Sequence, residues 1–254
     1  MNPMSLFDLT GRVAIVTGGT RGIGRAIAEG FAAVGASVVV ASRKADACAE
    51  TERAITASGG SALGVATHMG DLDAVVSLVD RAVDHFGGID IVVNNAANGL
   101  TMPIEDLTQE AWQKSHSVNL QGPVFLAKAA LPHLRTSDHG VVLNVISVGA
   151  VTWAPSTSMY AGAKAAMLAY TRNMAAEWAG YRIRVNALAP GTVDTDMVRN
   201  LGPGALERMK DLSWLKRVAN ADEMIGPALF LVSDASSYVT GQLVIADGGY
   251  AVAR

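Results

Sequence analysis

The sequence predicts an α/β fold in a single domain spanning residues 1–254: a doubly wound parallel sheet of seven strands with helices on both faces. Three observations lead to this prediction. Short apolar runs alternate with longer helical stretches along the chain, which is typical of a parallel sheet covered by helices. Glycines cluster at the ends of the apolar runs, where tight turns are expected. An apolar fraction of 50% with 17% charged residues indicates a large buried core.

The expected strands are the short apolar runs, because strands of a parallel sheet are buried on both faces. The first follows Gly11 and breaks into a glycine-rich loop, and the others come after successive helices. They cover residues 12–17, 37–41, 62–67, 89–94, 140–146, 183–188 and 243–246.

The helices occupy the stretches between these strands. Gly35 ends the first, glycine pairs follow the second and third, and Pro132 is expected to end the fourth because proline interrupts a helix. The fifth is an alanine-rich run. The expected helices cover residues 25–34, 44–58, 72–86, 108–131, 158–179 and 221–232.

Tyr160 and Lys164 are the first candidate catalytic pair. They stand four residues apart in the alanine-rich run, so both side chains lie on one face of the helix, one turn apart. An adjacent ammonium stabilises a phenolate, so we expect it to lower the pKa of Tyr160 toward 7, a shift worth about 4 kcal/mol. The alternative is a tyrosine and a lysine on a half-exposed helix that does no chemistry.

The loop between the first strand and the first helix is a candidate phosphate site. Gly18, Gly22 and Gly24 let the backbone turn sharply and approach a pyrophosphate closely. The following helix directs its N–H groups and a partial positive charge at that anion. Ligands bind at the carboxyl ends of strands in such sheets, so the loop predicts dinucleotide binding.

The end of the second strand indicates which dinucleotide. An acidic residue there would accept hydrogen bonds from the ribose 2′-hydroxyl. The chain instead has Ser42 and Arg43, with Arg21 in the glycine loop. Two guanidinium groups and a hydroxyl suit a 2′-phosphate, so we expect NADP(H), with NAD(H) as the alternative.

With these features the chain resembles the short-chain dehydrogenases/reductases, in the branch of about 250 residues with a Tyr-x-x-x-Lys signature. The resemblance runs from Gly11 to Gly249 and rests on an ordered set of motifs, each weak alone. They are the loop at residues 17–24, Asn94-Asn95-Ala96-Ala97, Asn119, Ser147, Tyr160 with Lys164, and the segment at residues 190–195.

The resemblance implies a Rossmann fold and an NAD(P)-dependent oxidoreductase that transfers hydride between its cofactor and a carbonyl or secondary alcohol. Tyr160 is then the general acid or base, and Lys164 tunes its pKa and binds the nicotinamide ribose. Ser147 binds the substrate oxygen, and Asn119 helps to hold a water in a proton relay. Further cofactor contacts are implied for Thr20, Ile23, Asp71, Leu72, Asn95, Ala96, Pro190, Gly191, Val193 and Thr195.

Elementary chemistry agrees with these roles. The cofactor supplies the hydride, so the protein must place it, donate a proton and polarise the carbonyl. A phenol suits the second task and a serine hydroxyl the third. Two departures from the family pattern, Ala97 for glycine and Ile146 for serine, remove no catalytic group.

The substrate is expected to be a small-molecule carbonyl compound or alcohol of hydrophobic character, 3-oxoacyl thioesters included. Residues 98–104, 148–157 and a lid at residues 194–217 should wall its pocket with mostly apolar side chains. Family members are commonly homotetramers, and small residues on the Tyr160 helix would permit close helix packing, so we expect an oligomer of this kind.

Other function classes are disfavoured. A net charge of −3 without a basic run argues against nucleic-acid binding, and the five histidines show no metal-ligand spacing, so no metal is expected. No apolar run is long enough for a membrane span, and the first residues lack a signal peptide, so we expect a cytoplasmic protein. The alternatives left open are a catalytically silent dinucleotide-binding regulatory protein and an epimerase or dehydratase.

Overall fold

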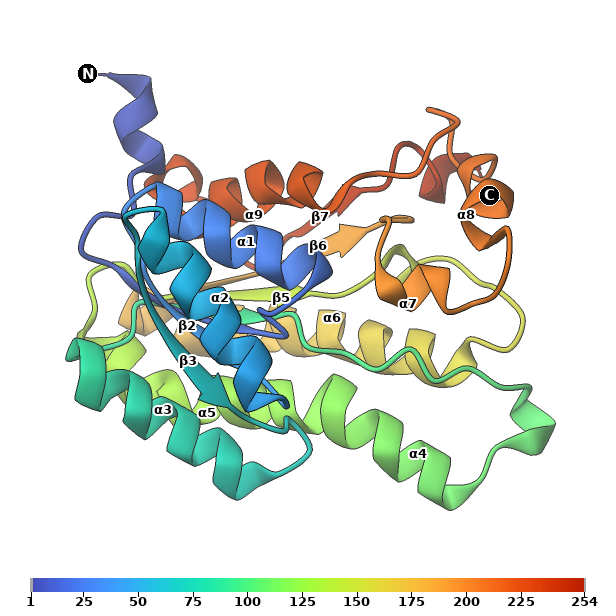
Figure 1. The fold of residues 1–254 in the computed structure, drawn as a ribbon, viewed down its shortest axis with the longest axis horizontal. Helices are drawn as coiled ribbons and strands as arrows, with labels where there is room; N and C mark the ends of the chain where they lie inside the picture. The colour runs from blue at the N-terminus through green and yellow to red at the C-terminus, as the bar shows by residue number, and fades with distance from the viewer. Residues whose placement is uncertain (1, 254) are drawn as a thin grey trace.

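The fold, seen in a computed structural model that describes residues 2–253, is one domain built on a seven-stranded parallel sheet (Figure 1). The strand order is β3-β2-β1-β4-β5-β6-β7. Strands β2 and β3 are thus added on one side of β1, and β4 to β7 are added on its other side. The strands are β1 Val13–Thr17, β2 Ser37–Ser42, β3 Ser61–Ala66, β4 Ile91–Asn94, β5 Val141–Val145, β6 Arg184–Pro190 and β7 Leu243–Ala246.

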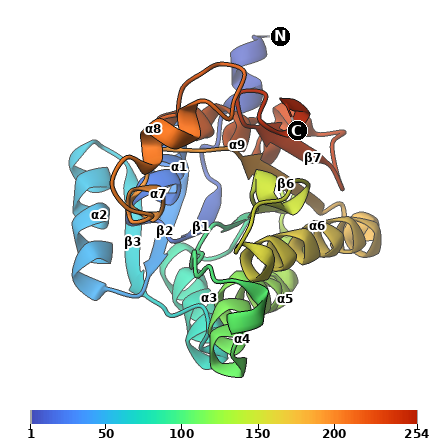
Figure 2. The same ribbon diagram turned by 90° about the vertical axis from the view of Figure 1, so that its right-hand side faces the viewer.

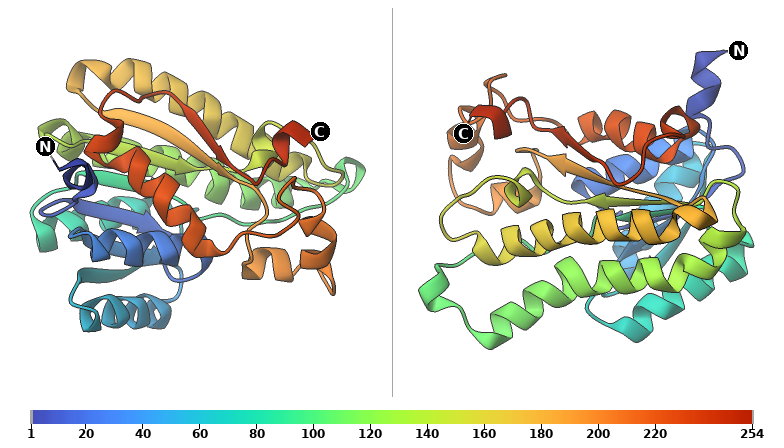
Figure 3. Two further views of the ribbon diagram at one scale, coloured as in Figure 1. Left: turned by 90° about the horizontal axis from the view of Figure 1, so that it is seen from above. Right: turned by 180° about the vertical axis from the view of Figure 1, so that it is seen from behind.

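Helices cover both faces of the sheet. In Figure 1, α1 and α9 lie above it, and α3, α5 and α6 lie below it, where the view from behind in Figure 3 shows them side by side. The main helices are α1 Gly22–Ala33, α2 Ala45–Ala57, α3 Leu72–Phe86, α5 Gly122–Thr136, α6 Ser158–Trp178 and α9 Ile225–Val232. Three further helices complete the fold: α4 Gln109–His116, which precedes α5, and the short helices α7 Asp196–Arg199 and α8 Ala205–Lys210.

Each face of the sheet has its own apolar core. Every residue of β1, β4 and β5 is buried, because these central strands carry a helix layer on each side. Phe31 of α1 and Leu231 of α9 belong to the core on one face, and Leu78 of α3 and Leu126 of α5 belong to the core on the other. The predicted doubly wound sheet with seven strands is therefore confirmed.

The helix predicted at residues 108–131 is wrong in two respects. It is divided into α4 and α5 by a π-helical turn, Ser117–Gln121, and α5 continues past Pro132 to Thr136. Pro132 cannot donate a hydrogen bond to the Lys128 carbonyl, four residues earlier, and its ring crowds that carbonyl. Lys128 is exposed, so water can satisfy that carbonyl, and the helix tolerates the proline close to its end.

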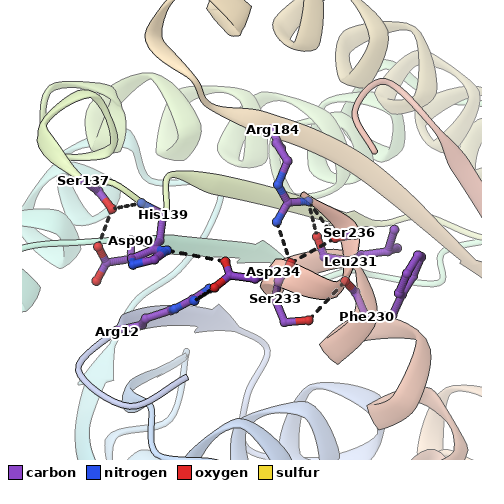
Figure 4. Close-up of polar contacts among 10 residues, drawn as sticks. All are labelled: Arg12, Asp90, Ser137, His139, Arg184, Phe230, Leu231, Ser233, Asp234 and Ser236. Carbon is purple, nitrogen blue, oxygen red and sulfur yellow. Dashed lines mark hydrogen bonds and ion pairs between the residues drawn. The ribbon is translucent and has the colours of Figure 1, made fainter. Parts of the chain in front are cut away.

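A polar cluster lies at the amino-terminal ends of the strands, away from their carboxyl ends (Figure 4). Arg12, just before β1, donates to Asp234 at 2.7 Å. Arg184 of β6 donates to the carbonyls of Leu231 and Ser233 at 2.9 and 3.0 Å. Burial lowers the pKa of Arg184 to about 10. The cluster therefore links both halves of the sheet to the segment that follows α9.

In the described part of the chain, none of the helices has the length and apolar character needed to cross a bilayer.

Candidate active site

The carboxyl ends of the strands carry nearly all of the predicted site residues. The loops after β1, β4, β5 and β6 gather at the end of the molecule that bears α7 and α8, and Figure 2 looks onto this end with α7 next to α1. β1 and β4 are neighbours here, where the winding of the sheet reverses. A ligand is expected in the crevice at that reversal.

The glycine loop has the geometry that the sequence predicts. Gly18 and Gly22 have positive φ angles of 66° and 51°, which only glycine adopts readily. A Cβ on Gly24 would stand 2.3 Å from the Gly18 carbonyl oxygen and 2.3 Å from Asn95 Nδ2. The loop can therefore close on itself and pack against the segment after β4 only with glycine at these positions.

The start of α1 fits an anion. Arg21 is its N-cap residue and makes no side-chain capping hydrogen bond, so Gly22, Ile23 and Gly24 begin the helix without a side-chain acceptor for their N–H groups. By contrast, Asp71 caps α3 with its own carboxylate. An uncapped helix start beside a glycine loop is what a pyrophosphate requires, so the residues present fit a dinucleotide.

Thr17 fastens this loop to the segment after β4. Its hydroxyl donates to the Val93 carbonyl at 3.1 Å and accepts the N–H groups of Asn95 and Ala96 at 3.0 and 3.1 Å. The Asn95 side chain also donates from Nδ2 to the Thr17 carbonyl at 2.8 Å. The predicted cofactor residues Asn95 and Ala96 thus lie directly against the glycine loop.

Ser147 is the second residue after the end of β5. Its backbone is extended, and its Oγ accepts the N–H of Gly149 at 3.1 Å as the cap of a short 3₁₀ turn, Val148–Ala150. In this contact the Ser147 oxygen is the acceptor, so its hydroxyl hydrogen can be donated to another group. The hydrogen bond between Ser147 and Tyr160 brings this hydroxyl to the phenol.

Tyr160 and Lys164 share one face of α6, as predicted. Lys164 is 3% exposed and donates from Nζ to the Val145 carbonyl at 3.0 Å, so the end of β5 holds the ammonium in place. Its Nζ lies 5.7 Å from the centre of the Tyr160 ring. Ser147, Tyr160 and Lys164 therefore converge at the carboxyl end of β5.

The pKa of Tyr160 is shifted in the direction opposite to the expected lowering. Burial raises the pKa of Tyr160, and the hydrogen bond from Ser147 only partly opposes this. Burial also lowers the pKa of Lys164 to about 8, because no carboxylate offsets its charge. The ammonium bonds to a carbonyl and carries its own desolvation cost, so it stabilises the phenolate less than expected.

Asn119 is fully buried in the π-helical turn, and its side chain is committed to structure. Its Oδ1 accepts the N–H of Asn98 at 2.9 Å, while Nδ2 donates to the Asn98 carbonyl at 3.0 Å and to Ser115 Oγ at 3.0 Å. The amide thus fixes the loop after β4. The role of Asn119 in holding a water of a proton relay stays a prediction.

The residues predicted around the adenosine lie at the ends of β2 and β3. Thr20 of the glycine loop donates to Ser42 Oγ at 3.1 Å, which brings the loop to the end of β2. Arg43 follows and is exposed. Asp71 and Leu72 stand at the start of α3, where one oxygen of Asp71 accepts two N–H groups of the helix. Their contact with adenine stays a prediction.

The segment after β6 returns to the glycine loop. β6 extends to Pro190, and a Cβ on Gly191 would stand 2.7 Å from the Asp247 backbone. Val193 is buried, and the Thr195 methyl lies against Gly22. Sequence reasoning missed one contact here, a 3.2 Å ion pair between Arg21 and Asp196. No local signal reveals it, since the partners are 175 residues apart.

Within residues 2–253, no three or more histidine, cysteine, aspartate or glutamate side chains are grouped to hold a metal ion.

Comparison with known proteins identifies the family. The family model described as enoyl-(acyl carrier protein) reductase matches residues 18–251. The chain belongs to the short-chain dehydrogenase/reductase family. As a member of it, the protein is an oxidoreductase that uses a nicotinamide cofactor.

Three similar short-chain dehydrogenases/reductases illustrate the range of the family. A cis-4-hydroxycyclohexanecarboxylate dehydrogenase of Sinomonas cyclohexanicum is 39% identical, over 94% of this chain and 96% of its own. A gluconate 5-dehydrogenase of Gluconobacter oxydans (strain 621H) is 34% identical over 99% of each chain. The crystal structure of a 3-oxoacyl (acyl-carrier-protein) reductase from Agrobacterium tumefaciens C58 with NADP bound matches with a TM-score of 0.92, at 36% identity over 98% of each chain.

Proposed function

We propose that the protein is an NADP(H)-dependent reductase of hydrophobic ketones, 3-oxoacyl thioesters included. The observation that carries the proposal is the convergence of Ser147, Tyr160 and Lys164 at the carboxyl end of β5, next to an uncapped helix start that fits a pyrophosphate.

The protein's own groups then act as follows. The Ser147 hydroxyl donates to the substrate carbonyl oxygen and polarises it. The bound cofactor supplies the hydride. Tyr160 gives its proton to the developing alkoxide, and its raised pKa keeps the phenol protonated at neutral pH, which is the form a general acid needs. Lys164 holds the nicotinamide ribose, and Asn119 holds a relay water through its main chain.

The preference for NADP(H) rests on charge at the adenosine end. Arg21 and Arg43 are both exposed, and the residue directly after β2 is Arg43 rather than an aspartate or glutamate. The related 3-oxoacyl reductase holds NADP. The other cofactor contacts proposed for the chain lie in the glycine loop, at the start of α3, after β4 and in the segment from Pro190 to Thr195.

The proposal of a hydrophobic substrate rests on the composition of the three segments proposed to wall its pocket. Seven large apolar residues of the three proposed wall segments are exposed, among them Trp153 at 71%, Trp214 at 64% and Leu215 at 63%. The other four are Ile104, Val151, Met197 and Leu201. Such a wall favours ring or acyl ketones over the polyols that a gluconate dehydrogenase takes.

We further propose that residues 194–217 form a lid on a single catalytic domain, and that the enzyme is a cytoplasmic homotetramer. The exposed aromatic face of α4 and α5, with Trp112 at 48% and Phe125 at 39%, supports an oligomer because such side chains are usually covered.

The test is NADPH oxidation with a panel of ketones, diketones, acetoacetyl thioesters and keto-sugar acids. We expect turnover on a hydrophobic class, and a loss of about 10²–10⁴-fold in kcat for Tyr160→Phe with NADPH binding retained. Turnover confined to keto-sugar acids would contradict the substrate class. Tight NADPH binding without reduction of any carbonyl or oxidation of any alcohol would favour the silent regulatory protein.

A further inference from the structure

The start of α7 reaches across the proposed cofactor site. A Cβ on Gly22 of the glycine loop would stand 3.0 Å from Thr195 Cγ2, and one on Gly99 after β4 would stand 3.0 Å from Met197 Cγ. Asp196 lies between these two contacts, and its Oδ2 is 3.2 Å from Arg21 Nη1. The lid thus rests on both sides of the site, and one ion pair joins it to the glycine loop.

The ion pair directs Arg21 toward the lid. The 2′-phosphate is expected beside Ser42, at the end of β2, which the loop reaches through the Thr20–Ser42 hydrogen bond. The lid follows β6, and β2 and β6 lie on opposite sides of β1 in the sheet. A guanidinium bonded to Asp196 therefore has to turn away from the lid before it can bind a phosphate at β2.

We propose that Asp196 is a specificity-determining residue: its carboxylate competes with the cofactor's 2′-phosphate for Arg21. The inference rests on the proposed function, which places the 2′-phosphate near Arg21. NADP(H) must displace the Asp196 carboxylate, whereas NAD(H) leaves the ion pair in place. The residue therefore weakens the preference for NADP(H), and phosphate binding detaches the lid from the glycine loop.

The exposure of the Arg21–Asp196 ion pair sets how strongly Asp196 can change the cofactor preference. The side chains of Arg21 and Asp196 are 68% and 55% exposed, so water screens the pair strongly. Exposed ion pairs of this kind change an equilibrium by about 1.5- to fivefold. The effect should shrink at high ionic strength, where the Debye length falls to a few ångströms.

The same lid offers a matched control. Asp194 is two residues earlier and is engaged by Arg199 at 2.7 and 2.9 Å, within the lid itself. Asp194→Asn removes one negative charge from the same segment, as Asp196→Asn does, without touching Arg21. Any general effect of lid charge on an anionic cofactor therefore appears in both variants.

The experiment measures the Kd of NADPH and of NADH by cofactor fluorescence for wild type, Asp196→Asn and Asp194→Asn, at low and high salt. We expect Asp196→Asn to tighten NADPH by about 1.5- to fivefold relative to NADH at low salt, and less at high salt. Asp194→Asn should leave the ratio unchanged. In an Arg21→Gln background, Asp196→Asn should no longer alter it.

An unchanged ratio in Asp196→Asn, an equal change in both variants, or a change that persists without Arg21 would overturn the inference. The wild-type measurements test the proposed function separately. If wild type shows no preference and Asp196→Asn creates one, the proposed cofactor preference fails and the role of Asp196 stands. If wild type binds neither dinucleotide, both proposals fail.

Discussion

Replacing Thr17 with valine tests how the glycine loop is held against the segment after β4. The side chain is 1% exposed, and valine has nearly the same shape, so the change removes hydrogen bonds without opening a cavity. The N–H groups of Asn95 and Ala96 lose the oxygen that accepts them at 3.0 and 3.1 Å, and the Val93 carbonyl loses a donor.

The magnitude follows from the two N–H groups. Each unsatisfied buried donor costs about 1–3 kcal/mol, so we expect the free energy of unfolding to fall by about 2–6 kcal/mol. Because Asn95 and Ala96 belong to the proposed cofactor site, the Kd of NADPH should rise as well. Urea unfolding followed by circular dichroism measures the first effect, and a fluorescence titration measures the second.

Thr51→Val is the matched control. Thr51 is also fully buried, but its hydroxyl only donates to the Ala47 carbonyl at 3.0 Å, within its own helix. That carbonyl already has a helical N–H partner, so we expect a loss below about 1 kcal/mol. The reasoning would be refuted if Thr17→Val destabilised no more than Thr51→Val and left NADPH binding unchanged.

Two further predictions concern Lys164 and Gly24. The pKa of Lys164 in the folded protein, about 8, lies below its ordinary value of 10.5. Between these two pH values the unfolded chain holds a proton that the folded chain lacks, so the free energy of unfolding rises with pH. Relative to Lys164→Met, wild type should gain about 2 kcal/mol of unfolding free energy from pH 8 to 10 in urea titrations, and a flat or falling difference would contradict this. Gly24→Ala should lose at least about 1–3 kcal/mol of stability and bind NADPH weakly, because its Cβ would stand 2.3 Å from the Gly18 carbonyl oxygen. Gly162→Ala, whose Cβ meets nothing within 4 Å, should melt no lower than wild type, and equal melting temperatures for the two variants would argue against the close packing.

The sheet was the most predictable part of the fold. Its central strands are buried on both faces, so their sequences are continuous apolar runs that stand out without any knowledge of the packing. Strand ends were off by one or two residues. β6, for example, continues through Pro190, because proline is tolerated where a strand ends and its missing N–H breaks no ladder bond.

The helix at residues 108–131 failed for a physical reason. The residues of the π-helical turn, Ser117–Gln121, are all compatible with an ordinary α-helix, so the sequence carries no signal for the wider turn. Tertiary contacts hold it instead: Asn119 bonds to Asn98, in a loop 21 residues earlier. The positions of Ser147, Tyr160 and Lys164 could be predicted, because the first follows a strand and the other two share a helix face.

Contacts and electrostatics within the site could not be predicted in the same way. The spacing of Tyr160 and Lys164 gives their common face, but the sign of a pKa shift depends on burial and on what each group bonds to. The carbonyl of Val145, which takes the Lys164 ammonium, is such a partner. Likewise, the ion pair of Arg21 depends on how the lid folds back over the sheet.

The polar cluster at the amino-terminal ends of the strands bears on folding during synthesis. Arg12 is synthesised early, yet its carboxylate partner, Asp234, lies 222 residues later, and Arg184 also depends on the segment that follows α9. On a ribosome, Arg12 can therefore form this ion pair only after almost the whole chain has emerged. Contacts of such long sequence separation close slowly. A nascent chain that stalls before Asp234 therefore lacks this ion pair between the first strand of the sheet and the segment after α9.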